Sequence, residues 1–235
     1  MPRELSPRQL TGLDDSHLET LPDGHRLQAE VAEAFAALQQ DARDAGFELA
    51  IASSFRSYER QLAIWNGKAS GERPVYDDED RVLSLAAMSP AEQLRAILRF
   101  SAIPGTSRHH WGTDLDVFDA GAVPDDYEVQ LSLAEVSAGG PFDAMHNWLD
   151  ARMAAGGSHG FYRPYAVDRG GVAPERWHLS YAPLAVSCAG ILHADTLRAC
   201  WDEGELLLRG EIESALADIM DGYVKVPDDW CPAYA

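Results

Sequence analysis

Residues 105–117, GTSRHHWGTDLDV, constrain the fold most, because they place carboxylates where a buried strand would carry apolar side chains. In a strand, residues two apart point to the same face, so Asp114 and Asp116 share one face and the intervening apolar residues share the other. Burying a carboxylate is costly unless a cation or hydrogen-bond donors meet it. Gly112 allows the preceding loop to fold back, which would bring His109 near these carboxylates. The segment predicts a strand whose polar face binds a metal ion, pairs with an arginine or is open to solvent.

The rest of the chain predicts an α+β fold, with a small, mostly antiparallel sheet flanked by helices. Helices precede and follow a few strands instead of alternating with them. Hydrophobic periodicity, caps and turn residues predict helices over 26–45, 57–68, 90–100 and 141–157, and a largely helical tail over 184–221. Besides the strand described above, strands are expected over 47–55, 161–167 and 177–181.

The charge balance excludes several classes of partner. Lys and Arg number 19 against 38 Asp and Glu, which gives a formal net charge of −19. Nucleic acid and anionic lipid both require a basic surface, so neither is expected as a partner. We find no apolar run long enough to span a membrane. The first thirty residues lack the apolar stretch of a secretion signal, which favours a cytoplasmic location; if a leader has been removed, the expected location is periplasmic.

A second polar cluster, PERWHLSY at 174–181, offers a partner for the first. His178 begins a predicted strand, and Glu175 lies in the loop before it. A catalytic zinc ion takes three protein ligands and keeps one position open for water. His109, Asp116 and His178 would supply those ligands, leaving Glu175 to act as the general base. Taken singly, each of these residues is also compatible with a purely structural role.

The third candidate, Arg56, directly follows the predicted buried strand over 47–55. An arginine is costly at such a position unless it faces a cleft with an anion to meet. It would stabilise an oxyanion that develops during hydrolysis, or hold a substrate carboxylate through paired hydrogen bonds. Pairing with one of the many local acidic residues is the structural alternative.

Together, the motifs SSFRS, SRHHWGTDLD and ERWH resemble the three signatures of the VanY-type D-alanyl-D-alanine carboxypeptidases. This family belongs to a wider zinc group with the lysostaphin-like peptidases and the hedgehog signalling domain. The pattern S-x-H-x-x-G-x-x-x-D falls on Ser107, His109, Gly112 and Asp116, and the pattern E-x-W-H falls on Glu175, Trp177 and His178. The resemblance runs from about residue 46 to residue 182, and GFYRPY at 160–165 is also typical of the family.

The resemblance implies one Zn²⁺ ion bound by His109, Asp116 and His178, with Glu175 and Arg56 as catalytic residues. Arg56 would contact the scissile carbonyl or the terminal carboxylate of the substrate. Substrate contacts are implied for Gln61, Ser107, Ser53 and Trp177. The implied partners are peptidoglycan stem peptides or D-alanyl peptides. We expect a single domain over 1–235, with a peptidase core over about 26–182, an N-terminal extension over 1–25 and a helical C-terminal extension over 183–235.

One position departs from the family pattern, and another matches no role in the family. Asp114 replaces a residue that is usually small; it would accept a hydrogen bond from a ligand imidazole, or be the ligand itself if the strand register is shifted. His110 matches no family role, and we expect it to support a neighbouring group or the fold.

The expected function is removal of the C-terminal D-alanine from peptidoglycan-type peptides. An L,D-carboxypeptidase and a D-Ala-D-Ala dipeptidase would share every motif, and selectivity is expected to reside in residues 68–104 and 119–147. Two other classes stay open. Two histidines and one carboxylate also form the iron site of non-haem oxygenases. A non-catalytic, zinc-stabilised module that binds cell-wall peptides would need neither Glu175 nor Arg56.

Overall fold

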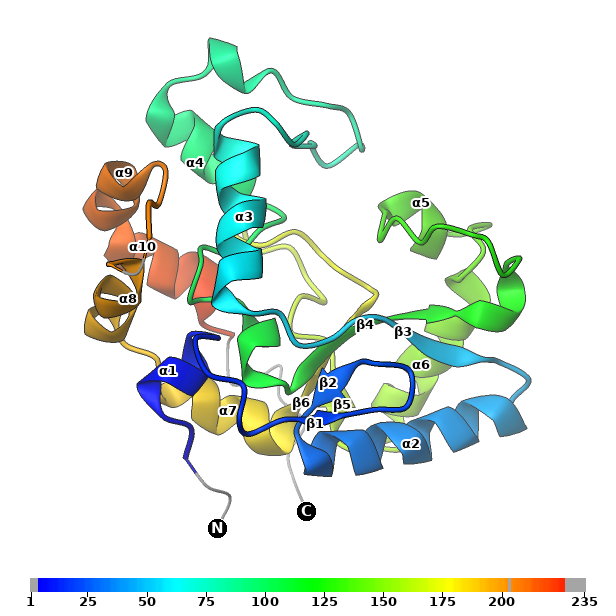
Figure 1. Cartoon of the computed structure of the whole chain (residues 1–235). Helices are drawn as coiled ribbons and strands as arrows, with labels where there is room; N and C mark the ends of the chain where they lie inside the picture. The colour runs from blue at the N-terminus through cyan, green and yellow to red at the C-terminus, as the bar shows by residue number, and fades with distance from the viewer. Residues whose placement is uncertain (1–3, 203, 227–235) are drawn as a thin grey trace.

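The computed structural model describes residues 4–202 and 204–226, and a four-stranded antiparallel sheet lies at its centre (Figure 1). The strand order is β3-β4-β6-β5, formed by β3 (Leu49–Ser53), β4 (Asp114–Asp119), β5 (Phe161–Tyr162) and β6 (His178–Tyr181). A second, two-stranded sheet pairs β1 (Glu19–Thr20) with β2 (Arg26–Leu27). The predicted α+β class, with a small antiparallel sheet and flanking helices, is confirmed.

One face of the central sheet packs on helices α2 (Ala29–Asp44) and α6 (Asp143–Ala154), which lie below it in Figure 1. Leu115 of β4 and Leu179 of β6 are directly paired and fully buried in this apolar core. Because side chains alternate along a strand, the neighbouring polar residues of both strands point to the opposite face. The sheet therefore has one apolar face and one polar face, as the sequence predicts.

A second apolar core consists mainly of residues from helices. Its members are α3 (Tyr58–Ala69), α4 (Pro90–Leu98), α7 (Ala182–Ile191), α8 (Ala194–Trp201), α9 (Arg209–Ser214) and α10 (Leu216–Ile219), with a π-helical turn over Met220–Val224. The predicted helical tail is confirmed up to residue 224; residues 227–235 of the expected extension lie outside the described part. No helix within the described ranges has the length and apolar character needed to cross a membrane.

Local caps explain where the helices beside the site begin. Ser57 caps α3 by accepting a hydrogen bond from the Arg60 amide. Ser89 and Glu92 form a reciprocal capping box at the start of α4, with Pro90 at its first position, where no amide donor is needed. Both starts agree with the sequence prediction.

Two predicted boundaries are wrong. The helix predicted over 26–45 begins at Ala29, because Arg26 and Leu27 instead pair with β1. The strand predicted over 161–167 ends at Tyr162. Pro164 has no amide hydrogen for a strand ladder, which makes continued pairing unfavourable.

The N-terminal segment, with helix α1 (Pro7–Leu10), packs on the loop that carries the two histidines. His110 is fully buried there; its Nδ1–H donates to the Arg56 carbonyl at 2.6 Å, and its Nε2 accepts from the Gly105 amide at 3.1 Å. Burial lowers the pKa of His110 to about 3, and the Arg56 carbonyl offsets only part of this effect, so the ring is neutral at physiological pH. His110 thus links its own loop to the segment of Arg56, which agrees with the supporting role expected for it.

Gly12 and Gly46 provide a matched test of this packing. Both have a left-handed backbone, with φ of 77° and 90°, but a Cβ on Gly12 would lie 2.4 Å from His110 Nδ1, while one on Gly46 would meet nothing within 4 Å. Gly46→Ala should cost about 1–2 kcal/mol for the backbone conformation alone. Gly12→Ala should cost a further ~1–3 kcal/mol for displacing the ring. Urea unfolding of the two variants measures the difference, and equal losses would contradict this account of His110.

Candidate metal centre and pocket

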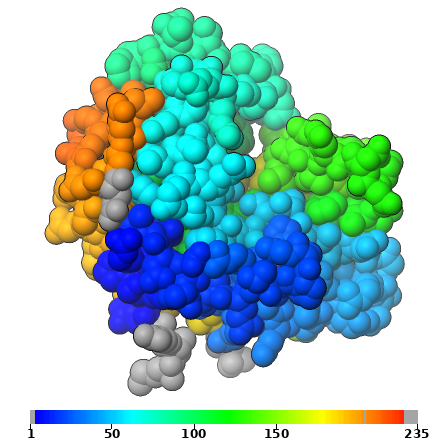
Figure 2. Space-filling view, in the orientation of Figure 1, coloured from blue at the N-terminus to red at the C-terminus, as the bar shows by residue number. Residues whose placement is uncertain are grey.

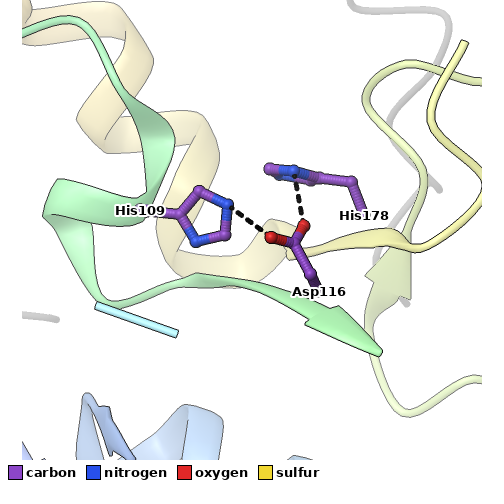
Figure 3. Close-up of side chains that lie close together, drawn as sticks. All are labelled: His109, Asp116 and His178. Carbon is purple, nitrogen blue, oxygen red and sulfur yellow. Dashed lines mark ion pairs between the residues drawn. The ribbon is translucent and has the colours of Figure 1, made fainter. Parts of the chain in front are cut away.

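His109, Asp116 and His178 come together on the polar face of the sheet, and Figure 3 shows the two imidazoles meeting the carboxylate from either side. One ligand atom from each residue lies within 4.8 Å of the others, and all three residues are buried. Nε2 of His109 is 3.4 Å from Asp116 Oδ2, and Nδ1 of His178 is 3.3 Å from Asp116 Oδ1. The three atoms are close enough to share one cation.

The local structure explains this convergence. Asp116 and His178 are directly opposite each other in the antiparallel pairing of β4 with β6. His109 lies in a 3-10 turn over Arg108–Trp111, which ends at Gly112 with a φ of 67°. A glycine adopts this left-handed conformation without a steric penalty, and the chain then turns directly into β4.

The outer nitrogens of both imidazoles are already occupied. Nδ1 of His109 lies 2.9 Å from the Ser54 carbonyl oxygen, and Nε2 of His178 lies 3.0 Å from Asp114 Oδ1. A carbonyl and a carboxylate only accept hydrogen bonds, so these two nitrogens carry the hydrogens. When the rings are neutral, the inner nitrogens, which face Asp116, keep their lone pairs and can bind a metal ion.

Asp114 is held behind His178 by a buried ion pair. Arg108 Nε donates to Asp114 Oδ1 at 2.8 Å, and both side chains are almost completely buried. Arg108 Nη2 also donates to the hydroxyls of Ser180 and Tyr162, and Thr113 Oγ1 donates to Asp114 Oδ2. Of the two alternatives for Asp114, the structure therefore supports the first: Asp114 accepts a hydrogen bond from the His178 imidazole. The strand register is not shifted, so Asp116 faces the two histidines.

The charges of the cluster fit a bound cation. Burial by itself would lower the pKa of His178, but Asp114, Asp116 and Glu175 outweigh burial and hold this pKa well above its usual value. Asp116 Oδ1 is buried and accepts no hydrogen bond from the residues that the structure describes. An unsatisfied carboxylate oxygen is costly to bury. Two imidazoles and a carboxylate form a donor set that Zn²⁺ readily accepts, so these residues fit the ion expected from the sequence.

Glu175 and Arg56 both reach the edge of this cluster. Glu175 Oε2 is 3.5 Å from His178 Nδ1, but Glu175 is outside the group of three converging residues. Arg56 Nη1 donates to Gln61 Oε1 at 2.9 Å, and its Nη2 lies 3.4 Å from Ser53 Oγ. Burial lowers the pKa of Arg56, and the nearby charges of Asp116 and Glu175 act in the opposite direction.

A pocket of about 550 Å³ opens over the cluster, and Figure 2 shows the surface hollowed between the α3–α4 region and the region of α5 (Leu133–Val136). Arg56, Ser107, Glu175 and Trp177 line it together with the three converging residues. Gln61 is fully buried, and its amide group is used by Arg56 and by the Ala102 carbonyl. In this structure Gln61 and Ser53 support Arg56.

The walls of the pocket come partly from the segments in which selectivity is expected. Residues 68–102 and 130–133 both contribute, as does a segment that the sequence did not indicate: Ile219, Tyr223 and Val224 of the C-terminal extension. Its contribution depends on long-range packing and leaves no local sequence signal. The sequence analysis did not identify Arg108 or Lys68 as residues of the site. Arg108 could have been identified, because a buried Asp114 requires a nearby cation and Arg108 lies in the same motif.

Comparison with known proteins decides the family. The family model of VanY, D-alanyl-D-alanine carboxypeptidase, matches residues 24–184. The chain belongs to this family. Its members are peptidases, and the resemblance inferred from the three motifs is confirmed.

The chain is also similar to two curated proteins and to solved structures of VanY proteins. Two uncharacterized proteins of Haemophilus influenzae are similar to this chain. One is 46% identical over 104 residues, which cover 43% of this chain and 71% of that protein. The other is 31% identical over 125 residues, which cover 52% of this chain and 92% of that protein. VanYB in complex with D-alanine-D-alanine has a TM-score of 0.51 at 21% identity, covering 86% of this chain and 90% of its own. A VanY mutant in complex with Zn(II) has a TM-score of 0.51 at 20% identity, covering 90% and 95%. At these identities the structural likeness concerns the fold.

Asp114→Asn tests the support behind His178. The substitution weakens the hydrogen bond that orients the imidazole, so zinc affinity should fall by about 10- to 100-fold. It also leaves the buried Arg108 charge without its counter-charge, and stability should fall with it. Chelator competition measures the affinity, and urea unfolding measures the stability.

Ser180→Ala is the matched control, because it removes a hydrogen bond from Arg108 without touching His178. Its zinc affinity should stay within about twofold of the unaltered protein. A similar fall in both variants would show that the loss reflects general destabilisation and not the orientation of His178.

Proposed function

We propose that the protein is a zinc-dependent carboxypeptidase that removes the C-terminal D-alanine from peptidoglycan-type peptides. One observation carries the proposal: one ligand atom each from His109, Asp116 and His178 lies within 4.8 Å of the others, while Glu175 lies beside them outside the set, with its Oε2 3.5 Å from His178 Nδ1. A structural zinc site is normally closed by four protein ligands, whereas a catalytic site keeps a position open. Three ligands and an adjacent carboxylate support a hydrolytic site.

A zinc ion held by these three residues would supply the Lewis acidity that makes water nucleophilic near neutral pH. Glu175 accepts a proton from the attacking water as the water oxygen bonds to the scissile carbonyl carbon. When the carbon–nitrogen bond breaks, Glu175 passes this proton to the leaving amine, and free D-alanine is released. The reaction consumes one water molecule and needs no other co-reactant.

Arg56 is placed to bind a negatively charged group of the reacting peptide. Its guanidinium is fixed by Gln61 and Ser53 and faces the pocket, so it binds the carbonyl oxygen as charge develops on it, or the terminal carboxylate of the peptide. The backbone amide of Arg56 also donates to the His109 carbonyl at 3.2 Å, which ties it to the metal ligands.

The two alternative classes are less well supported. A non-catalytic module has no need of a carboxylate and a guanidinium that line the same pocket as the three converging residues. An iron oxygenase with the same three ligands would be expected to have a double-sheet β fold, whereas the described residues form a four-stranded sheet among helices, and the family is one of peptidases.

Glu175→Gln tests the catalytic base. The amide keeps the shape of the side chain but accepts no proton, so kcat for a peptide ending in D-Ala-D-Ala should fall by about 10²- to 10⁴-fold. Bound zinc should be unchanged, because Glu175 is not a ligand. Release of D-alanine and metal analysis measure the two effects. The exposed Glu59→Gln on α3 is the control, and a Glu175→Gln variant with full activity would refute this mechanism.

Arg56→Lys tests the planar guanidinium, because lysine keeps the charge but loses the fork of donors. The expected loss in kcat/KM is about 10²- to 10³-fold, the effect of removing a donor to a developing oxyanion. Arg60→Lys, at an exposed position in the first turn of α3, should leave kcat/KM unchanged. Activity of Arg56→Lys equal to that of the control would remove Arg56 from the reaction.

A further inference from the structure

Lys68 lies in the pocket but in none of the three family motifs. It occupies the last turn of α3, seven residues after Gln61, so the two side chains lie on the same face of the helix. Its Nζ donates to Ser101 Oγ at 2.6 Å, and both residues line the pocket. The helix that supports Arg56 near its first turn therefore presents a second cation to the pocket from its last turn.

Lys68 and Arg56 share an unusual property in a chain with twice as many acidic as basic residues. Within residues 4–202 and 204–226, no carboxylate lies within ion-pair distance of either side chain, although both are partly buried. Every other buried or partly buried arginine in these ranges forms an ion pair with an acid: Arg26, Arg99, Arg108, Arg152, Arg163, Arg176 and Arg209.

Lys68 has no carboxylate in direct contact among the described residues, and its surroundings disfavour its charge. Burial lowers its pKa to about 8, the charge of Glu175 offsets part of this effect, and the charges of Arg56 and Arg73 lower the pKa further. A partly buried ammonium group with one hydroxyl acceptor still has donors to offer to an anion. The sequence contains only two lysines, Lys68 and Lys225, and all its other basic side chains that count as cations at neutral pH are arginines.

We propose that Lys68, positioned by Ser101, is a specificity-determining residue that binds a carboxylate of the peptide substrate. The inference rests on the proposed peptidase function and adds a substrate class to it: peptides that carry a carboxylate within reach of the last turn of α3. Two sources share this chemistry, the terminal carboxylate of the residue to be released and a side-chain carboxylate on the other side of the scissile bond. An ammonium–carboxylate hydrogen bond is favourable in a site partly shielded from water.

Binding to the zinc-loaded Glu175→Gln variant tests this without turnover. Calorimetry would compare three peptides: one with both carboxylates and a D-Ala-D-Ala end, its C-terminal amide, and a version whose side-chain carboxylate is amidated. Adding Lys68→Met should weaken binding of the first peptide by about 10- to 100-fold, the effect of losing one charged hydrogen bond. The peptide that lacks the carboxylate bound by Lys68 should show no further loss, which identifies the source. Lys68→Arg should restore most of the affinity, and Lys225→Met should change nothing.

Equal losses for all three peptides, or no loss for any, would overturn the inference while the peptidase proposal stands. If the zinc-loaded Glu175→Gln protein binds none of the peptides, the peptidase proposal fails and this inference fails with it. Acetylation by an amine-specific reagent gives a second readout in the otherwise unaltered Glu175→Gln protein. With only two lysines, mass spectrometry resolves each one, and the first peptide should protect Lys68 but not Lys225. Unprotected Lys68 at saturating peptide would also overturn the inference.

Discussion

The pairing of Asp116 with His178 across strands β4 and β6 is the constraint on which the rest of the site depends. Two strands with apolar residues on one face have little freedom of register, since a shift by one residue would turn every side chain to the wrong face. Burial of Leu115 and Leu179 on α2 and α6 therefore places a carboxylate and an imidazole side by side on the other face. The apolar core sets the geometry of the polar cluster.

Supporting groups behind the cluster limit how it can respond to a ligand. His178 is hydrogen-bonded to Asp114, which forms an ion pair with the buried Arg108. His109 is hydrogen-bonded to a backbone carbonyl. Buried ion pairs of this kind add little net stability, but breaking one leaves a charge without a partner. The orientation of both imidazoles is thus set before any ligand arrives, which reduces the entropic cost of binding one.

The sequence predicted the elements and residues whose signals are local. Alternation in TDLD and the order of the three motifs were sufficient for the polar face, the converging triad and the family. The prediction of a strand beyond Tyr162 was wrong because it gave more weight to the apolar residues of this segment than to Pro164, which cannot donate a backbone hydrogen bond. Residues brought in by tertiary packing were not predictable: the pocket wall from Ile219 to Val224 lies over a hundred positions from His109 in the chain. Lys68 could have been found, since it follows Gln61 by two helical turns.

An anomalous difference map from crystals grown with zinc, recorded at the zinc absorption edge, tests the central claim most directly. The account predicts one peak on the polar face, about 2.0–2.2 Å from Nε2 of His109, Nδ1 of His178 and the Asp116 carboxylate. Glu175 should lie close to the ion without binding it. A peak held by other residues, a peak coordinated by Glu175 as a fourth protein ligand, or no peak among these side chains would contradict the account.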